Sequence, residues 1–200
     1  MNEKIFTAKP YIDEDTCNSV LEVLKSGMIT QGVKVAELEA KFAEYCNVEH
    51  SAALNSGTAA LHAGLFALGV ERDDEVITSP FTFVASANSI LMMGAKPVFA
   101  DINEDTFNID TKDIQNKITK KTKVIMPIHL YGLLSDMTEI QSIAKEARLR
   151  VLEDACQAHG ATFNGQKAGS FGDVSAFSLY ATKNIMAGEG GILTSSNEEY

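Results

Sequence analysis

The chain has 200 residues, of which 45% are hydrophobic and 22% charged, a composition typical of a globular fold with a sizeable core. Its net charge of −10 argues against a nucleic-acid partner, because phosphate contacts need clustered Lys and Arg. It shows neither an apolar run of transmembrane length nor a signal-peptide stretch, so we expect a cytoplasmic protein with no membrane partner. The three cysteines and four histidines lack paired spacing, so neither disulfides nor a metal site is predicted.

Two amphipathic helices are expected first, at residues 13–25 and 35–45, joined by a turn that contains two glycines at residues 26–32. Beyond residue 50, helical patterns occur at residues 57–68, 85–93 and 137–147. Short apolar runs predict strands at residues 52–55, 75–79, 96–101, 123–128, 150–154, 174–178 and 191–195. Alternating strands and helices predict an α/β fold with a largely parallel sheet. Ligands of such sheets collect at the carboxyl ends of the strands.

The first candidate site opens the helix that follows residue 55. Ser56, Gly57 and Thr58 stand at its start, where unpaired N–H groups and the positive end of the helix dipole favour an anion. Glycine also lets the backbone approach a ligand closely. A serine N-cap on a core helix is the commoner meaning of this motif alone, so phosphate binding is one of two interpretations.

The second candidate is a carboxylate at the end of an apolar strand. Asp154 either caps the next turn or pairs with a protonated ring nitrogen, which strengthens a pyridine cofactor as an electron sink. Strand alternation places Asp154 and Cys156 on the same face. Cys156 would then pack against the ring, because no neighbouring base in the sequence could generate a thiolate.

The third candidate is Lys183, which lies between an apolar strand and the glycine-rich residues 188–191. Most lysines lie on the surface, but a lysine in a ligand-lined loop can form a Schiff base. Ser178 could add a hydroxyl to a cofactor phosphate. An anion-binding helix start, a ring-nitrogen carboxylate and a lysine are together the three parts of a pyridoxal 5'-phosphate (PLP) site.

The whole chain resembles the DegT/DnrJ/EryC1/StrS family of PLP-dependent sugar-nucleotide aminotransferases. The matching stretches are dense and collinear, at residues 27–32, 55–61, 75–85, 94–101, 127–132, 153–161 and 182–191. The resemblance implies the aspartate aminotransferase fold (fold type I), a three-layer α/β/α arrangement around a mostly parallel mixed sheet. We expect an N-terminal segment with the first helix at residues 1–32. Residues 33–200 would then form the large PLP-binding domain, incomplete at its C-terminus and without the small domain.

The resemblance also implies roles for residues of the second and third candidates. Lys183 would hold the cofactor covalently and later move the proton between substrate and cofactor. Asp154 would pair with the pyridine nitrogen, and Gln157 would lie near the phenolic oxygen. His129 and His159 fall within matching motifs, where a structural role is at least as well supported as a functional one.

Further roles that the resemblance implies concern the cofactor phosphate and the two faces of its ring. Gly57, Thr58 and Ser178 would hold the phosphate. Phe83 would stack on one face of the ring, and Cys156 would line the other. No metal is expected.

The implied reaction is transamination in two halves, in which glutamate gives its amino group to PLP and a keto group of a nucleotide-linked sugar then receives it. Thr30 would face that substrate. Family members are homodimers whose partner chain completes the phosphate site, and polysaccharide biosynthesis is a usual setting. We expect exposed apolar surface where the small domain would pack.

Three alternatives stay open at this point. Some relatives carry histidine in place of the lysine and catalyse dehydration, which Lys183 disfavours here. Another fold type I PLP enzyme is the second alternative. The third is a truncated, non-catalytic PLP-binding protein without a substrate domain.

Overall fold

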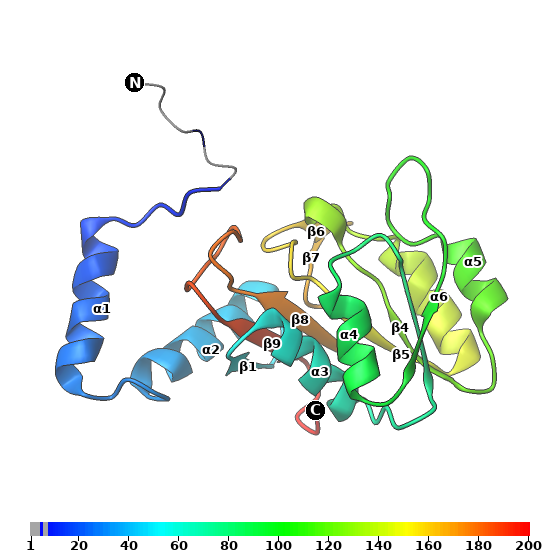
Figure 1. Cartoon of the computed structure of the whole chain (residues 1–200), viewed down its shortest axis with the longest axis horizontal. Coiled ribbons are helices and arrows are strands. Elements are labelled where there is room, and N and C mark those ends of the chain that lie inside the picture. Colours follow the sequence, from blue (N-terminus) through cyan, green and yellow to red (C-terminus); the bar gives the residue numbers. More distant parts are fainter. Residues whose placement is uncertain (1–4, 6–7) are drawn as a thin grey trace.

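A seven-stranded sheet forms the centre of the computed structural model (Figure 1), which describes residue 5 and residues 8–200. Its strands are β1 (His50–Leu54), β2 (Glu75–Thr78), β3 (Lys96–Phe99), β4 (Thr122–Met126), β5 (Arg150–Asp154), β8 (Val174–Ser178) and β9 (Gly191–Ser195). The order across the sheet is β1-β9-β8-β5-β4-β2-β3. β9 runs antiparallel to both of its neighbours, and the other strand pairs are parallel. The predicted mixed, mostly parallel sheet is confirmed.

Helices cover both faces of this sheet (Figure 1). The helices of the described residues are α1 (Glu14–Ser26), α2 (Val33–Cys46), α3 (Gly57–Ala67), α4 (Ala85–Met92), α5 (Thr111–Lys117) and α6 (Met137–Ala147), with a 3-10 turn, η1 (Leu130–Gly132), and α1 does not cover the sheet. α3 and α4 pack on one face, and α2, α5 and α6 pack on the other. The three layers match the predicted fold class.

Consecutive strand residues send their side chains to opposite layers, which explains why the inner strands carry apolar residues at consecutive positions. In β4, Val124 packs under α3 and Ile125 packs under α6, and both are fully buried. β5 repeats the pattern with Val151 and Leu152. The inner strands are therefore fixed in register by two separate cores.

The predicted strands and helices all form, with ends within two residues of the expected ones. Three short elements were missed, namely α5, η1 and the separate hairpin of β6 (Thr162–Phe163) and β7 (Gln166–Lys167). α5 buries a single residue, Ile114, so it has no apolar periodicity. The hairpin strands are too short to show alternation.

The first helix buries none of its residues, and Val20, Leu21 and Leu24 are exposed. Figure 1 shows α1 extending away from the sheet and its covering helices. Residues 1–4 and 6–7, which begin the expected N-terminal segment, lie outside the described residues. No helix in the described part of the chain has the length and apolar character needed to cross a membrane.

Candidate active site

A cavity of about 400 Å³ lies where the carboxyl ends of β5 and β8 meet the start of α3. β5 and β8 are parallel neighbours, with Asp154 opposite Ala176 in the register. β1 joins the same edge through β9, so α3, which follows β1, begins beside the end of β8. Sheet topology thus gathers three segments that are far apart in the sequence.

Every predicted cofactor residue lines this cavity. The set is Gly57, Thr58, Phe83, Asp154, Cys156, Gln157, Ser178 and Lys183. Thr30, expected to face the substrate, lies instead in a separate hollow between α1 and α2. Neither His129 nor His159 is among the residues that line the cavity.

The start of α3 presses closely against the end of β8. A Cβ atom added at Gly57 would lie 2.7 Å from the Ser178 Cβ and 3.1 Å from the Cys156 Sγ. Only glycine therefore fits at this position. The Ser56 side chain caps the helix by accepting from the Ala59 N–H at 3.1 Å. Within the described residues, the Gly57 and Thr58 N–H groups at the positive helix end have no acceptor.

Asp154 is 5% exposed, and its two carboxylate oxygens are held differently. The Ser86 hydroxyl donates to Oδ2 at 2.7 Å. The Cys156 N–H approaches Oδ1 at 3.3 Å, a longer and weaker contact. The Asp154 backbone is paired with Pro127 and His129 at 2.9 and 3.1 Å. Oδ1 therefore keeps capacity to accept another hydrogen bond.

Lys183 lies in the connection between β8 and β9. Its N–H donates to the Tyr180 carbonyl at 2.9 Å, and Leu179 donates to the Gly190 carbonyl at 2.8 Å, which closes the loop at its base. Lys183 is half-buried and is the single lysine that lines the cavity. No carboxylate of the described residues forms an ion pair with it.

Cys156 and Gln157 follow Asp154 in the sequence and line the same side of the cavity. The Tyr131 N–H donates to the Gln157 Oε1 at 2.8 Å, so the amide orientation assigned from this bond leaves the NH₂ group as a donor. Burial raises the pKa of the Cys156 thiol well above its usual value, and the Asp154 charge adds to the rise. The thiol is thus protonated at neutral pH, which fits packing rather than nucleophilic attack.

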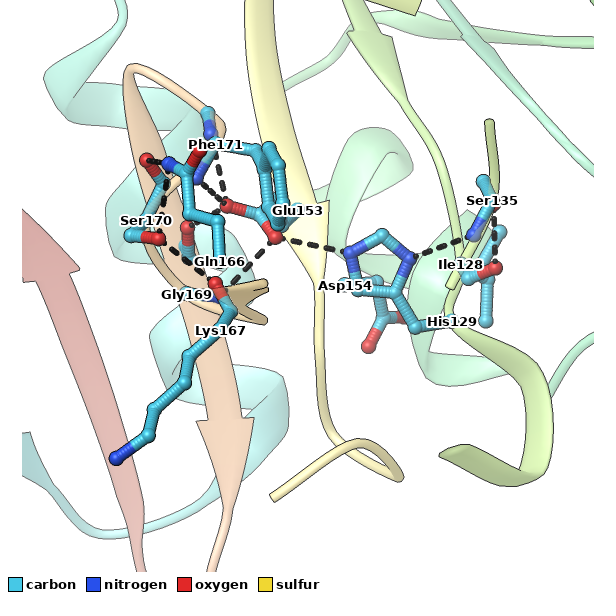
Figure 2. Close-up of polar contacts among 12 residues, drawn as sticks. Ile128, His129, Ser135, Glu153, Asp154, Gln166, Lys167, Gly169, Ser170 and Phe171 are labelled. Atoms are coloured by element: carbon cyan, nitrogen blue, oxygen red, sulfur yellow. Dashed lines mark hydrogen bonds and ion pairs between the residues drawn. The ribbon is translucent and has the colours of Figure 1, made fainter. Parts of the chain in front are cut away.

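A second carboxylate, Glu153, precedes Asp154 on β5 and is fully buried. Figure 2 shows its contacts with His129 on one side and with the segment around Gly169 on the other. Because neighbouring strand residues face opposite ways, Glu153 points away from the cavity that Asp154 lines. The Ser175 hydroxyl donates to it at 2.7 Å and the N–H groups of residues 169, 171 and 172 at 2.7–3.0 Å. The His129 Nε2 lies 2.9 Å from it. Burial raises the pKa of Glu153, but these hydrogen bonds outweigh burial and the pKa lies below its usual value.

The histidines of the matching motifs have different surroundings. The Ser135 N–H donates to the His129 Nδ1 at 3.3 Å, so the proton of this ring is assigned to Nε2, which donates to Glu153. His159 is 8% exposed, and neither ring nitrogen has a partner within the described residues. Burial lowers the pKa of His159 to about 4, so this imidazole is neutral at pH 7.

The sequence interpretation missed Thr82 and Ser86, which also line the cavity. Ser86 is the second residue of α4, and Thr82 lies in the segment before that helix. A signal was present, because two hydroxyl residues four apart flank a helix start just after a buried strand end. Polar side chains at the carboxyl edge of an α/β sheet indicate a ligand-binding site.

A lysine, a buried carboxylate and a helix start with N–H groups left free within the described residues line one cavity at the carboxyl edge of a mixed α/β sheet, an arrangement typical of α/β proteins with a ligand site at that edge. Residues 10–200 match the sequence model of the DegT/DnrJ/EryC1/StrS aminotransferase family, and the chain belongs to that family. The resemblance predicted from the motifs is therefore confirmed.

Similar proteins support the same assignment. The chain is 46% identical to the spore coat polysaccharide biosynthesis protein SpsC of Bacillus subtilis, covering 95% of the chain and 49% of SpsC. It is 43% identical to the GDP-perosamine synthase of Caulobacter vibrioides, with 98% and 53% covered. A putative sugar aminotransferase from Streptococcus pneumoniae, solved in its PMP form, superposes with a TM-score of 0.94 at 35% identity, with 98% and 53% covered. The chain thus spans about half the length of these relatives.

Proposed function

We propose that the cavity binds PLP and that the protein transfers an amino group from glutamate to a keto group of a nucleotide-linked sugar. The observation that carries this proposal is the meeting of Lys183, Asp154 and the start of α3 in one cavity. Relatives named as a GDP-perosamine synthase and a sugar aminotransferase support the sugar substrate. We further propose a cytoplasmic homodimer.

The residues present fit this cofactor. The missing Cβ of Gly57 leaves room at the helix end, and the N–H groups of Gly57 and Thr58 can donate to a phosphate. Ser178 Oγ accepts weakly from the Tyr180 N–H at 3.3 Å, so its own hydrogen can be donated to the same anion. An acidic chain thereby gains a local anion site.

When bound, PLP supplies an aldehyde that condenses with amines and a ring that accepts an electron pair. Lys183 is the amine that reaches the cavity, and we assign it the attachment of the cofactor and the movement of the proton at its Nζ. Asp154 Oδ1 would hold the proton of the ring nitrogen, and the Gln157 NH₂ would donate to the phenolic oxygen. Phe83, 69% exposed at the cavity, offers a ring face for stacking.

The dimer proposal follows from the family resemblance and from the surface near the cavity. Phe81, Phe83, Tyr131 and Leu133 are all large and exposed. Apolar surface of this kind is typical of an interface. Sedimentation of the purified protein is expected to give twice the chain mass, and a monomer at micromolar concentration would contradict this part of the proposal.

The cofactor proposal is tested by adding PLP, recording visible absorbance, reducing with borohydride and mapping the labelled peptide. We expect a yellow band, a single label on Lys183 and loss of the band with glutamate. Lys183→Ala should abolish the band, whereas the exposed matched control Lys145→Ala should retain it. A label spread over several lysines, or a band that persists in Lys183→Ala, would refute the assignment.

The substrate class needs a second assay. After glutamate has converted the cofactor, nucleoside-diphosphate keto sugars are added one at a time, with simple keto acids as controls. Return of the visible band with a keto sugar and formation of its amino sugar are expected. Return with keto acids alone would indicate an amino-acid aminotransferase instead.

A further inference from the structure

Asp154 is held by a hydroxyl that comes from a different layer of the fold. Ser86 lies on α4, is 1% exposed and donates to the Asp154 Oδ2 at 2.7 Å, a distance within the usual range for a hydroxyl bonded to a carboxylate. The two residues are 68 positions apart in the sequence. This contact is therefore set by the packing of α4 against the sheet rather than by local turn geometry.

A second hydroxyl fixes the direction of this bond. The Thr82 Oγ1 and Ser86 Oγ atoms are 2.9 Å apart. An ionised carboxylate only accepts, so the single Ser86 hydrogen points to Asp154, and the Thr82 hydroxyl must donate to Ser86. The result is a chain of two hydroxyls that ends on Asp154, in which each bond polarises the next.

The backbone of α4 holds Ser86 in place from both sides. Its N–H donates to the Phe83 carbonyl at 3.1 Å, and the Ser89 hydroxyl donates to the Ser86 carbonyl at 2.9 Å. Ser86 has little freedom to follow Asp154 if that carboxylate turns. With Oδ2 tied to Ser86, the carboxylate plane is set and Oδ1 is the oxygen left for another donor.

We infer that Ser86, supported by Thr82, is a positioning residue that orients the Asp154 carboxylate toward the ring nitrogen of the cofactor. This inference rests on the proposed function, because it assigns Oδ1 to the pyridine nitrogen. Without Ser86, one buried carboxylate oxygen loses its donor, and the group can rotate or recruit water. The bond between Asp154 and the ring nitrogen then weakens.

The test is a set of purified variants titrated with PLP by visible absorbance, first at fixed pH and then across pH. Hydrogen bonds to charged groups contribute enough that Ser86→Ala should weaken PLP binding by about tenfold or more. The pH midpoint of the visible band should also move upward. In the variant the ring nitrogen would lose its proton more easily. Without that nearby positive charge, the nitrogen that joins Lys183 to the cofactor would keep its own proton to a higher pH.

Matched variants separate positioning from packing. Ser195→Ala removes a buried hydroxyl that donates to the Asp173 carbonyl at 2.8 Å, at the end of the sheet away from the cavity. It should leave both the affinity and the midpoint within about twofold and about 0.2 pH units of wild type, since distant sites act independently. Ser86→Thr keeps the hydroxyl and should restore the midpoint. Thr82→Val should weaken binding by a smaller factor, about two- to fivefold, because it removes only the second hydroxyl.

The outcomes are distinguishable. If the wild-type protein shows the band and the Ser86→Ala midpoint equals that of Ser195→Ala, this inference alone is overturned. If Ser86→Ala fails to fold, Thr82→Val and Thr82→Ser decide: equal midpoints for both would overturn it, and a shift in the valine variant only would support it. No band in the wild-type protein would overturn the proposed function and this inference together.

Discussion

Replacing Glu153 by glutamine keeps the side-chain shape but removes the charge and turns one acceptor oxygen into a donor. In the native protein Oε1 receives three hydrogen bonds, from Ser175 and from the N–H groups of residues 171 and 172. Oε2 receives two, from His129 and from the N–H of Gly169. Every one of these donors is buried or partly buried, so water cannot replace a lost acceptor.

The amide has no orientation that satisfies its neighbours. Turned toward the Oε1 side, its NH₂ would face two backbone N–H groups. Turned toward the Oε2 side, it would face Gly169 and His129, whose tautomer is fixed by the Ser135 N–H. At least two buried donors lose their acceptor, and each such loss costs about 1–3 kcal/mol. The expected decrease in the free energy of unfolding is therefore about 2–6 kcal/mol.

Equilibrium unfolding in urea, followed by circular dichroism, measures this change. Glu71→Gln, at an exposed position, is the matched control and should lie within about 0.5 kcal/mol of wild type. A Glu153→Gln midpoint equal to that of the control would refute the claim that Glu153 organises residues 169–172 and His129. An equal decrease in both variants would point instead to a general effect of net charge.

Three further outcomes are expected. Burial lowers the pKa of His159 to about 4 from an ordinary 6.5, so between these pH values the unfolded chain binds a proton at this residue and the folded chain does not. The free energy of unfolding should therefore fall as the pH drops from 6.5 toward 4. His159→Leu should reduce this pH dependence, as urea titrations would show. Gly57→Ala, whose new methyl would overlap β8, should cost about 1–3 kcal/mol and weaken PLP binding, whereas Gly32→Ala meets no atom closer than 3.6 Å and should retain the wild-type affinity. Burial raises the pKa of Cys46 to about 12, so a thiol reagent at pH 8 should label the exposed Cys17 quickly and Cys46 only on unfolding, as peptide mapping would show.

Much of the sheet could be predicted from sequence because its strands are buried on both faces. Residues 150–154 and 174–178 carry apolar side chains at consecutive positions and end at polar ones, and their predicted ends match the observed ends. The edge strand β3 is exposed at both ends, and its predicted range ran two residues too long. The inner strand β4 was also predicted to end two residues too late, because Pro127 and Ile128 continue its apolar run past the last residue of the strand.

Gly57, Thr58, Asp154 and Ser178 could be predicted because they stand at strand ends or at a helix start, where the sequence pattern changes. Lys183 was predicted from the glycine-rich residues 188–191 that follow it, and Phe83 and Gln157 from the family resemblance. The sequence marks Ser86 only as a hydroxyl residue at a helix start, and its contact with Asp154 could not be predicted because that contact depends on which strand α4 crosses. Nothing in residues 82–86 specifies that Asp154 lies 2.7 Å away. Contacts between layers depend on the packing of the whole sheet, whereas contacts within a turn depend on neighbouring residues.

The adjacent carboxylates of β5 show how one strand can serve both structure and chemistry. Glu153 and Asp154 face opposite sides of the sheet, so the same backbone holds a fully satisfied carboxylate in the core and an under-satisfied one at the cavity. The buried network around Glu153 orders residues 169–172 and the His129 turn, whose backbone also pairs with Asp154. Asp154 leaves Oδ1 with only the long Cys156 contact, and its sequence neighbour Glu153 adds the hydrogen bonds that hold residues 169–172 and His129 beside this end of β5.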